Sequence, residues 1–280
     1  MKPNITIQGF EASFHEIVAL QFFGNDIKTI ECKTFPKLFD VMHKNKADYA
    51  VCAIENSIAG SILPNYAQLR KSDLKIIGEV YLRIEMNLMA LPNQTIEDIT
   101  EVHSHPIALL QCQKLFEKYP SIQLIESADT ALSAKEIKNY SIKHRAAIAS
   151  KRAAEIYGLN IIAADIHDNK RNFTRFLILT KQQNEDRKPA IINKSSLSFR
   201  TSHLPGSLAK VLTVIASHNI NLSKIQSLPV VGEEWQYYMY ADLEFDEAST
   251  YYKMLEEVQP YISELKILGE YQQGDKINKA

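Results

Sequence analysis

The stretch Tyr49-Ala50-Val51-Cys52-Ala53-Ile54 is a continuous apolar run, the pattern of a strand that is buried on both faces of a sheet. Short strands are also predicted along the chain at 5–8, 74–80, 86–90, 123–126, 146–149 and 176–179. Helical patterns fall between them, at 14–23, 35–44, 106–119, 130–139 and 151–157. Because strands and helices alternate, the first two-thirds of the chain is predicted to be an α/β layer fold with a largely parallel sheet.

Length favours one large or two domains, since 280 residues exceed one typical domain. The 32 basic and 33 acidic residues are interspersed, which argues against a nucleic acid or membrane surface recognised by bulk charge. No apolar run approaches the roughly 20 residues of a membrane helix. The N-terminus lacks the apolar stretch of a signal peptide. We therefore expect a soluble, cytoplasmic protein with no nucleic-acid or membrane partner.

Metal and nucleotide chemistry are not indicated by the sequence. The three cysteines, Cys32, Cys52 and Cys112, are scattered and form no Cys-x-x-Cys pair, so buried reduced thiols are expected. His103 and His105 have no third ligand at a suitable spacing. A Gly-x-Gly-x-x-Gly or P-loop signature, which a nucleotide-dependent enzyme would need, is not found.

Four polar clusters occur at the starts or ends of predicted strands and helices. The first is Asn172-Phe173-Thr174-Arg175-Phe176, which places an amide, a hydroxyl and a guanidinium just before the apolar run 176–179. Buried polar groups need hydrogen-bond partners, and beside a binding site the partner can be a ligand. The structural alternative is a strand entry in which Thr174 serves β-propensity and Arg175 is solvated.

The second cluster, Glu55-Asn56-Ser57-Ile58-Ala59-Gly60, follows the strand 49–54. Ligands in open α/β sheets bind at the carboxyl ends of strands. The cluster places a carboxylate, an amide and a hydroxyl together at the carboxyl end of this strand. The alternative is a turn in which Asn56 and Ser57 cap the next helix.

The third and fourth clusters lie at helix starts. Ser104-His105-Pro106 opens the predicted helix 106–119, and Gln111 lies one turn beyond Ile107. Gly9 to Ser13 links the first strand to the first helix, where Ser13 is a plausible N-cap. Helix N-termini favour anions, although a cap explains Ser13 fully. His105 fits an ordinary cap as well as it fits a substrate contact.

The pattern changes after the polar segment 182–189, which is the clearest linker. Strands are predicted at 196–201, 222–229, 237–245 and 265–270, and helices at 206–218 and 249–258. This βαββαβ order is that of the ferredoxin-like fold. The segment resembles an ACT domain, a module that binds small effectors at subunit interfaces. The resemblance lies in His203-Leu204-Pro205-Gly206-Ser207-Leu208 and in residues 219–227.

Together, the four clusters resemble the signature set of prephenate dehydratase. The resemblance implies a two-lobed catalytic domain over 1–187, similar to a type II periplasmic binding protein, and an ACT domain over 195–273. It implies decarboxylation and dehydration of prephenate to phenylpyruvate, without metal or organic cofactor, in L-phenylalanine synthesis. It also implies feedback inhibition by L-phenylalanine and a homodimer or homotetramer.

The resemblance also implies site residues. Thr174 matches the threonine proposed to assist departure of the ring hydroxyl, and Glu55 can complete a proton relay with it. The predicted substrate-binding residues are Ser13, Asn56, Ser57, Ser104, His105, Gln111, Asn172, Phe173 and Arg175. The predicted phenylalanine-binding residues are His203, Pro205, Gly206, Ser207, Leu208, Gln226, Ser227 and Leu228.

The chain departs from the family pattern at several positions. Ile107 stands where many members carry glutamine, His15 replaces a usual hydroxyl residue, and Ala12 replaces a usual glycine. In the ACT-like segment, Gln226-Ser227-Leu228-Pro229 replaces Glu-Ser-Arg-Pro, which removes two charges together.

Two other functions fit parts of the pattern. Arogenate dehydratase performs the same chemistry on an aminated substrate, and side-chain identities do not separate the two. A catalytically silent sensor could combine a two-lobed binding domain with an ACT domain. Thr174 between Asn172 and Arg175 favours the enzyme, because a sensor has no need of that hydroxyl.

Overall fold

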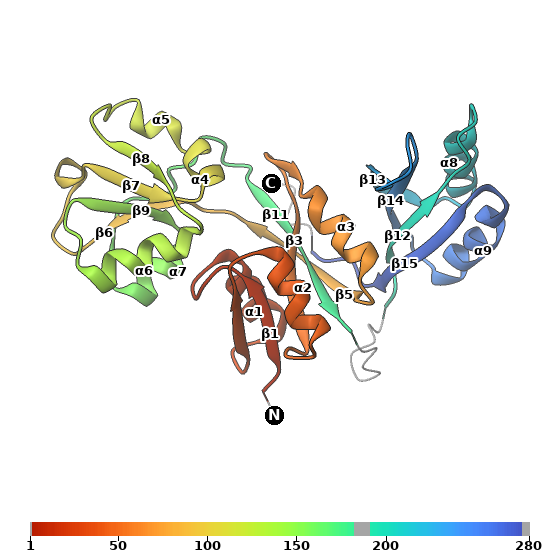
Figure 1. The fold of residues 1–280 in the computed structure, drawn as a ribbon, viewed down its shortest axis with the longest axis horizontal. Helices are drawn as coiled ribbons and strands as arrows, with labels where there is room; N and C mark the ends of the chain where they lie inside the picture. Colours follow the sequence, from red (N-terminus) through yellow and green to blue (C-terminus); the bar gives the residue numbers. More distant parts are fainter. Residues whose placement is uncertain (1, 182–190, 276–280) are drawn as a thin grey trace. The chain divides into compact units, whose positions relative to one another are not determined.

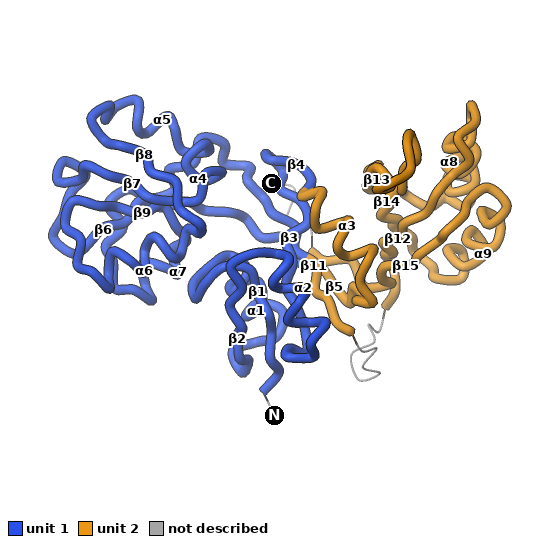
Figure 2. Tube along the Cα trace, in the orientation of Figure 1, with its two compact units in different colours: residues 1–61, 80–176, 277–280 blue, residues 62–79, 177–276 orange. Residues whose placement is uncertain are grey.

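The computed structural model describes residues 2–181 and 191–275, and the predicted linker 182–189 lies outside the described residues (Figure 1). Two compact units are formed (Figure 2). The first contains residues 1–61 and 80–176, and the second contains 62–79 and 177–276. Among the described residues, no helix combines the length and the apolar character that crossing a membrane requires.

The first sheet of the first unit is built around the apolar run that was predicted to be a buried strand. Its strands are β1 (Asn4–Gln8), β2 (Lys28–Cys32), β3 (Tyr49–Asn56), the short β4 (Gly60–Ser61) and the first part of β11 (Phe173–Thr180). β1 pairs in parallel with both β2 and β3, and residues 49–54 are all buried, as predicted. Helices α1 (Phe14–Phe23) and α2 (Phe35–His43) agree with the predicted helices.

A second, five-stranded sheet lies in the same unit. Its order is β10 (Asn160–Ala163), β6 (Asn87–Ala90), β9 (Arg145–Ala149), β7 (Glu101–Ser104) and β8 (Gln123–Glu126). β7 pairs in parallel with β8 and β9, whereas β6 pairs antiparallel with β9 and β10. The fold class is therefore α/β, and its two sheets include antiparallel strands. Strands β2, β4, β7 and β10 were not predicted.

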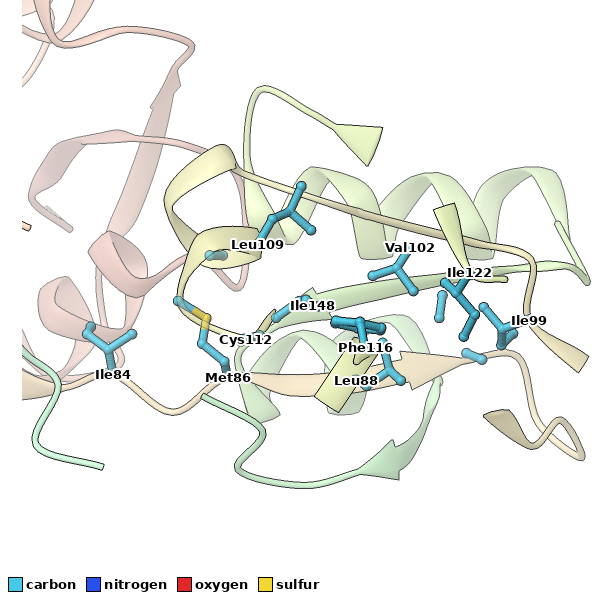
Figure 3. Packing of buried hydrophobic residues seen from close by; sticks show 13 residues of the cluster. Ile84, Met86, Leu88, Ile99, Val102, Leu109, Cys112, Phe116, Ile122 and Ile148 are labelled. Carbon is cyan, nitrogen blue, oxygen red and sulfur yellow. The ribbon is translucent and has the colours of Figure 1, made fainter. Parts of the chain in front are cut away.

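Alternate residues of β6 and β9 face opposite sides of this sheet and belong to two separate clusters. Leu88 and Ile148 pack with Leu109 and Phe116, which come from the chain around α4 and α5 (Figure 3). Met89 and its neighbours on β9 pack instead with α6 (Thr130–Tyr140) and α7 (Lys151–Tyr157). Since side chains alternate along a strand, both faces of the sheet are covered by helices.

The predicted single helix 106–119 is wrong. The segment forms two short helices, α4 (Pro106–Leu110) and α5 (Gln113–Phe116), separated at Gln111 and Cys112. Asp168 occupies the break. Its backbone N–H donates to the Gln111 carbonyl at 2.7 Å, and its carboxylate accepts from the Lys114 N–H at 3.2 Å. A distant loop therefore satisfies the backbone groups that a continuous helix would have paired internally.

The second unit contains the predicted βαββαβ order. Its elements are β12 (Lys194–Arg200), α8 (Ser207–Ser217), β13 (Asn221–Pro229), β14 (Tyr237–Glu244), α9 (Ala248–Val258) and β15 (Ser263–Tyr271). The antiparallel order β13-β14-β12-β15 places the first strand beside the third and the fourth, as in ferredoxin-like folds. One apolar cluster joins this sheet to α8 and α9.

Residues 62–79 also belong to this unit, which was not predicted. Helix α3 (Leu63–Lys71) carries Tyr66, whose ring stacks edge-on against Tyr240 of β14 at 5.3 Å between centroids. Arg70 donates to Ser198 at 3.0 Å and lies over the Tyr238 ring at 3.6 Å. Strand β5 (Lys75–Arg83) begins in this unit, where Ile76 pairs in parallel with Gly269 of β15, and continues into the first unit.

Candidate active site

Asn56, Asn172 and Thr174 form the centre of the candidate site. Asn56 lies at the end of β3. Asn172 directly precedes β11, the neighbouring strand in the sheet, and Thr174 lies at the start of that strand. The Asn56 Nδ2 group donates to Asn172 Oδ1 at 2.8 Å, to Thr174 Oγ1 at 2.9 Å and to the Phe173 carbonyl at 3.2 Å. Two of the four clusters found in the sequence are therefore joined by hydrogen bonds.

A third cluster reaches the same place through Gln111. The Gln111 Oε1 atom accepts a hydrogen bond from Asn172 Nδ2 at 2.8 Å. Gln111 occupies the C-cap of the short helix α4, so the helix break described above positions it. Asn172 is fully buried, whereas Gln111 and Thr174 keep 9% and 8% of their surface exposed. Gln111 and Thr174, at the two ends of the group, therefore keep a small exposed surface, and Asn56 between them is half-buried.

Ser57 holds residues 171–173, which directly precede Thr174, in place through hydrogen bonds. Its backbone N–H donates to the Phe173 carbonyl at 2.8 Å, and its hydroxyl accepts from the Phe173 N–H at 2.9 Å. The same hydroxyl donates to the Arg171 carbonyl at 2.9 Å. The alternative in which Asn56 and Ser57 cap the next helix is wrong, because the N-cap of that helix is Ile62 and has no side-chain hydrogen bond.

Arg175 is buried, with 5% of its surface exposed, so the alternative of a solvated guanidinium is wrong. Its guanidinium carbon lies 6.0 Å from the centre of the Tyr81 ring on β5. Tyr81 was not singled out in the sequence, and nothing in its local pattern distinguishes it from an ordinary strand residue. Glu55 is half-buried and pairs through its backbone with Ser61 of β4.

Three predicted site residues also have local structural roles. Ser13 caps α1 and accepts from the Glu16 N–H at 3.4 Å. Ser104 is fully buried and donates to the Ile148 carbonyl at 2.7 Å. His105 caps α4, since its Nδ1 accepts from the Ile107 N–H at 3.2 Å, and partial burial lowers the pKa of its imidazole.

The departures from the family pattern have distinct environments. His15 is buried, its Nε2 accepts from the Ala53 N–H at 3.4 Å, and its ring lies edge-on to Phe176 at 4.9 Å. Burial lowers the pKa of His15 to about 3, so this imidazole is neutral near pH 7. Ile107 is 41% exposed. The Ala12 backbone has a φ of 68°, in the left-handed region that favours glycine.

Loop 9–13 is bound to α7 and to its N-cap residue, a connection that the sequence did not indicate. Ser150 donates to the Ala12 carbonyl at 2.8 Å, and Tyr157 donates to the Glu11 carbonyl at 2.8 Å. Glu16 accepts from the Ala12 N–H at 2.8 Å and from Arg152 at 3.0 Å. This loop therefore connects the two sheets of the first unit.

Cysteine and metal chemistry have no site in the described residues. Cys32, Cys52 and Cys112 are free and buried, as predicted, and burial raises the pKa of Cys52 and Cys112 to about 12. No group of three or more His, Cys, Asp or Glu side chains within residues 2–181 and 191–275 is placed to hold a metal ion.

In the second unit, residues 201–209 line a hollow of about 490 Å³. It includes five of the predicted effector residues: His203, Pro205, Gly206, Ser207 and Leu208. Gly206 is the N-cap of α8 and has a φ of 81°. Gln226, Ser227 and Leu228 lie on β13, and these described residues do not line the hollow.

Comparisons with known proteins agree with these observations. A family model described as prephenate dehydratase matches residues 5–184. A bifunctional chorismate mutase/prephenate dehydratase from Aquifex aeolicus (strain VF5) is 38% identical over 272 residues, covering 96% of this chain and 74% of that protein.

Two solved structures cover almost the whole chain. One, described as a novel type of quorum quenching acylase, has a TM-score of 0.86 and 28% identity and covers 96% of this chain and 98% of its own. The other, prephenate dehydratase from Arthrobacter aurescens in complex with L-Phe, has a TM-score of 0.84 and 26% identity and covers 99% and 92%. On the family model and the 38% identical relative, the chain belongs to the prephenate dehydratase family.

Proposed function

We propose that this protein converts prephenate to phenylpyruvate, with loss of carbon dioxide and water, in the synthesis of L-phenylalanine. The observation that carries the proposal is the hydrogen bond from Asn56 Nδ2 to Thr174 Oγ1 at 2.9 Å. Because the Thr174 oxygen accepts this bond, its own hydrogen is available to donate to a ligand. A departing hydroxyl group needs such a donor.

The electron flow of the reaction defines what the site has to supply. The bond between the ring and its carboxylate breaks, and its electron pair enters the ring. The carbon–oxygen bond on the opposite side of the ring then breaks, and the departing hydroxide takes up a proton to become water. The product ring is aromatic, so the site mainly has to bind the dianion and stabilise the charge that develops on the leaving oxygen.

Thr174 is assigned to that oxygen as a positioned hydrogen-bond donor, because an alcohol is too weak an acid to deliver its proton alone near neutral pH. Glu55 is assigned as the group that returns a proton to the relay. Arg175 and Gln111 are assigned to the substrate carboxylates, since a guanidinium and an amide both donate to anions. The remaining predicted substrate-binding residues are assigned to surround these groups or to hold them in position: Ser13, Asn56, Ser57, Ser104, His105, Asn172 and Phe173.

Arogenate is the second candidate substrate, because its ring and leaving hydroxyl are those of prephenate and only the side chain is aminated. Arg175, the buried cation of the site, suits the carboxylates that the two substrates share. The chemistry assigned to Thr174 is unchanged with either substrate.

One experiment tests the proposal. The purified protein is mixed with prephenate, and phenylpyruvate formation is followed by its absorbance. The same measurement with arogenate follows phenylalanine. Turnover of prephenate with the higher kcat/KM supports the proposal, and faster turnover of arogenate would reassign the substrate. If the folded protein turns over neither substrate, a catalytically silent sensor would be the better explanation of its function.

The second unit is proposed to regulate this activity. We assign residues 1–187 to catalysis and 195–273 to an ACT domain that binds L-phenylalanine, in a homodimer or homotetramer located in the cytoplasm. The βαββαβ order and the hollow lined by residues 201–209 support the assignment. So does the helix start at Gly206, where exposed backbone amides favour a carboxylate. Neither reaction step above calls for a metal or an organic cofactor.

A further inference from the structure

Three side-chain amides form a continuous chain through the candidate site. Gln111 accepts from Asn172, Asn172 accepts from Asn56, and Asn56 donates to Thr174, with distances of 2.8, 2.8 and 2.9 Å. A carboxamide accepts at its oxygen and donates at its nitrogen. The orientation of any one amide in this chain therefore dictates the orientation of the next.

The backbone sets that orientation at Asn56. Its Oδ1 atom accepts from the Ile58 N–H at 2.9 Å and from the Ala59 N–H at 2.8 Å. Backbone N–H groups cannot become acceptors, so the Asn56 oxygen must face them. Its Nδ2 group must then face Thr174, Asn172 and the Phe173 carbonyl, which is itself a fixed acceptor.

Asn172 passes the orientation to Gln111. Its Oδ1 atom is occupied by Asn56, so its Nδ2 group is the one that donates to Gln111 Oε1. Because the Gln111 Oε1 atom faces Asn172, the Gln111 Nε2 group is the one that points away from Asn172. Both ends of the chain then present hydrogens, the hydroxyl of Thr174 at one end and the amide of Gln111 at the other.

We infer that Asn172 is a positioning residue that makes Gln111 a hydrogen-bond donor to a substrate carboxylate. Asn172 is completely buried and touches both neighbouring amides, so it acts through them. Two donors at the ends of the chain suit a dianion that also carries a leaving hydroxyl. The inference rests on the proposed function, because it names the role of Gln111 toward that substrate.

Asn172→Asp tests the inference. The introduced carboxylate still accepts from Asn56, but its second oxygen now faces Gln111 Oε1. Gln111 must turn over to donate to it, and its oxygen then faces the substrate carboxylate. We expect KM for prephenate to rise about 10- to 100-fold at pH 8, as when a hydrogen bond to a charged group is lost. The loss in kcat should be smaller, because Asn56 still orients Thr174.

The pH profile separates this role from a merely structural one. Once protonated, the carboxyl group introduced by Asn172→Asp can donate to Gln111 Oε1 and restore the original orientation. KM of the variant should therefore return toward the wild-type value as pH falls through the pKa of the new carboxyl, which burial raises. Asn169→Asp is the matched control, because it adds the same charge at an exposed position three residues away. Its KM should stay within about twofold of wild type, as usual for an exposed substitution.

Gln111→Glu tests the end of the amide chain that is proposed to face the substrate. It also replaces the first test if the Asn172→Asp variant does not fold. One glutamate oxygen can still accept from Asn172, and the other replaces Nε2. KM should rise at pH 8 and recover at lower pH. A Gln111→Glu variant with the wild-type KM at pH 8 would overturn the inference. An Asn172→Asp variant with wild-type KM at every pH, or with the same raised KM at every pH, would also overturn it.

Measuring prephenate turnover by the wild-type protein distinguishes failure of the proposed function from failure of the role inferred for Asn172. If the unmodified protein does not turn over prephenate, the proposed function fails and the assignment of Gln111 fails with it. If the unmodified protein is active and the variants follow the control, the proposed function stands and only the role of Asn172 is rejected.

Discussion

The Arg175 guanidinium lies 6.0 Å from the centre of the Tyr81 ring and is buried, with only 5% of its surface exposed. A buried cation requires compensation, and an aromatic face provides part of it. Since Arg175 comes directly after Thr174, the strand that carries the proposed hydrogen-bond donor also carries the cation that we propose for the substrate carboxylates.

The first prediction concerns this cation. Arg175→Lys should raise KM for prephenate about 10- to 100-fold, because a point charge replaces a planar group that can pair with both oxygens of a carboxylate. Steady-state kinetics with prephenate measures the change. Arg171→Lys, at an exposed arginine four residues earlier, is the matched control and should change KM little. Equal kinetics for the Arg175 variant and wild type would assign Arg175 to structure instead of binding.

The second prediction concerns the hydroxyl of Thr174. Thr174→Ala should lower kcat by roughly 10²- to 10⁴-fold, the range for a group that takes part in proton transfer. Thr174→Ser should retain much more activity, because it keeps the hydroxyl that accepts from Asn56. Thr180→Val removes a buried hydroxyl from the far end of the same strand and should leave kcat near wild type. A folded alanine variant with full kcat would show that the leaving group departs without this donor.

Strands and helices with strong apolar periodicity could be predicted from the sequence. The run at 49–54 is one example, and the βαββαβ order of the second unit is another. Elements in which polar residues share the buried positions were missed. Helix α3 buries Asn65 and Tyr66, and strand β7 buries His103 and Ser104, so neither shows the expected apolar pattern.

The residues of the candidate site could be predicted from the sequence, but the hydrogen bonds and contacts between them could not. Asn172 and Thr174 stood out because polar groups precede an apolar strand. The bond between Asn172 and Gln111 joins residues 61 apart, and it depends on the helix break that Asp168 occupies. Nothing local to Gln111 encodes that break, because the residues around it favour a continuous helix. The contact of Arg175 with Tyr81 likewise depends on the pairing of distant segments.

The third prediction concerns pH and Asp129. Burial raises the pKa of this carboxyl from 3.8 to about 6, while its carboxylate caps α6 by accepting from the Leu132 N–H at 3.0 Å. Because the folded pKa is above the unfolded value, stability is fully present below about pH 4 and falls as pH rises through about 6. Asp129→Asn keeps a capping oxygen and removes the buried charge.

Asp129→Asn should therefore raise the free energy of unfolding by about 1–3 kcal/mol at pH 7.5, with 1.36 kcal/mol for each unit of pKa shift. The gain should shrink toward zero near pH 4, where Asp129 itself is neutral. Urea unfolding at both pH values measures it. Asp98→Asn, at an exposed cap, is the control and should give no gain at pH 7.5. A gain that is independent of pH would show that the charge of Asp129 is not responsible.

The fourth prediction concerns a buried ion pair in the second unit. Lys194 Nζ lies 3.0 Å from Glu79 Oε1 and 3.3 Å from Glu244 Oε1, and the Lys194 and Glu79 side chains are 1% and 0% exposed. Lys194→Met should lower the free energy of unfolding by about 3–5 kcal/mol, because it leaves a buried carboxylate without its partner. Chemical denaturation measures the loss.

Adding Glu79→Gln to Lys194→Met should recover part of this stability, since the amide is neutral and can still accept from the Gly274 N–H. Lys2→Met provides the comparison for an exposed pair, in which Lys2 and Asp26 are 64% and 79% exposed. Its cost should stay below about 1 kcal/mol. The double variant could instead be less stable than Lys194→Met alone. That result would show that the other contacts of the Glu79 carboxylate stabilise the fold by more than its unpaired charge destabilises it.

The last prediction concerns regulation by L-phenylalanine. If residues 195–273 form the proposed ACT domain, millimolar L-phenylalanine should raise the melting temperature by mass action and inhibit turnover. The affinities for effector and substrate should be coupled by about 1–3 kcal/mol. Neutral Gln226 can still pair with an ammonium or a backbone group, and Leu228 can pack against an aromatic ring, so the loss of two charges from this strand need not abolish binding.

Gly206→Val should block the response. Apart from Gly206 and its two chain neighbours, no described residue has an atom within 4 Å of the position that a Cβ would take there, so the protein has room for the side chain. The φ of 81° is nevertheless unfavourable for a β-branched residue, and the added carbons cover the backbone amides at the start of α8. Gly232→Val is the matched control, because Gly232 has a φ of 88°, equally open space and no place in the lining of the hollow. It should keep the response to L-phenylalanine in calorimetry, melting and inhibition assays. If the wild-type protein shows no heat, no melting shift and no inhibition at millimolar L-phenylalanine, the second unit serves assembly instead of effector binding.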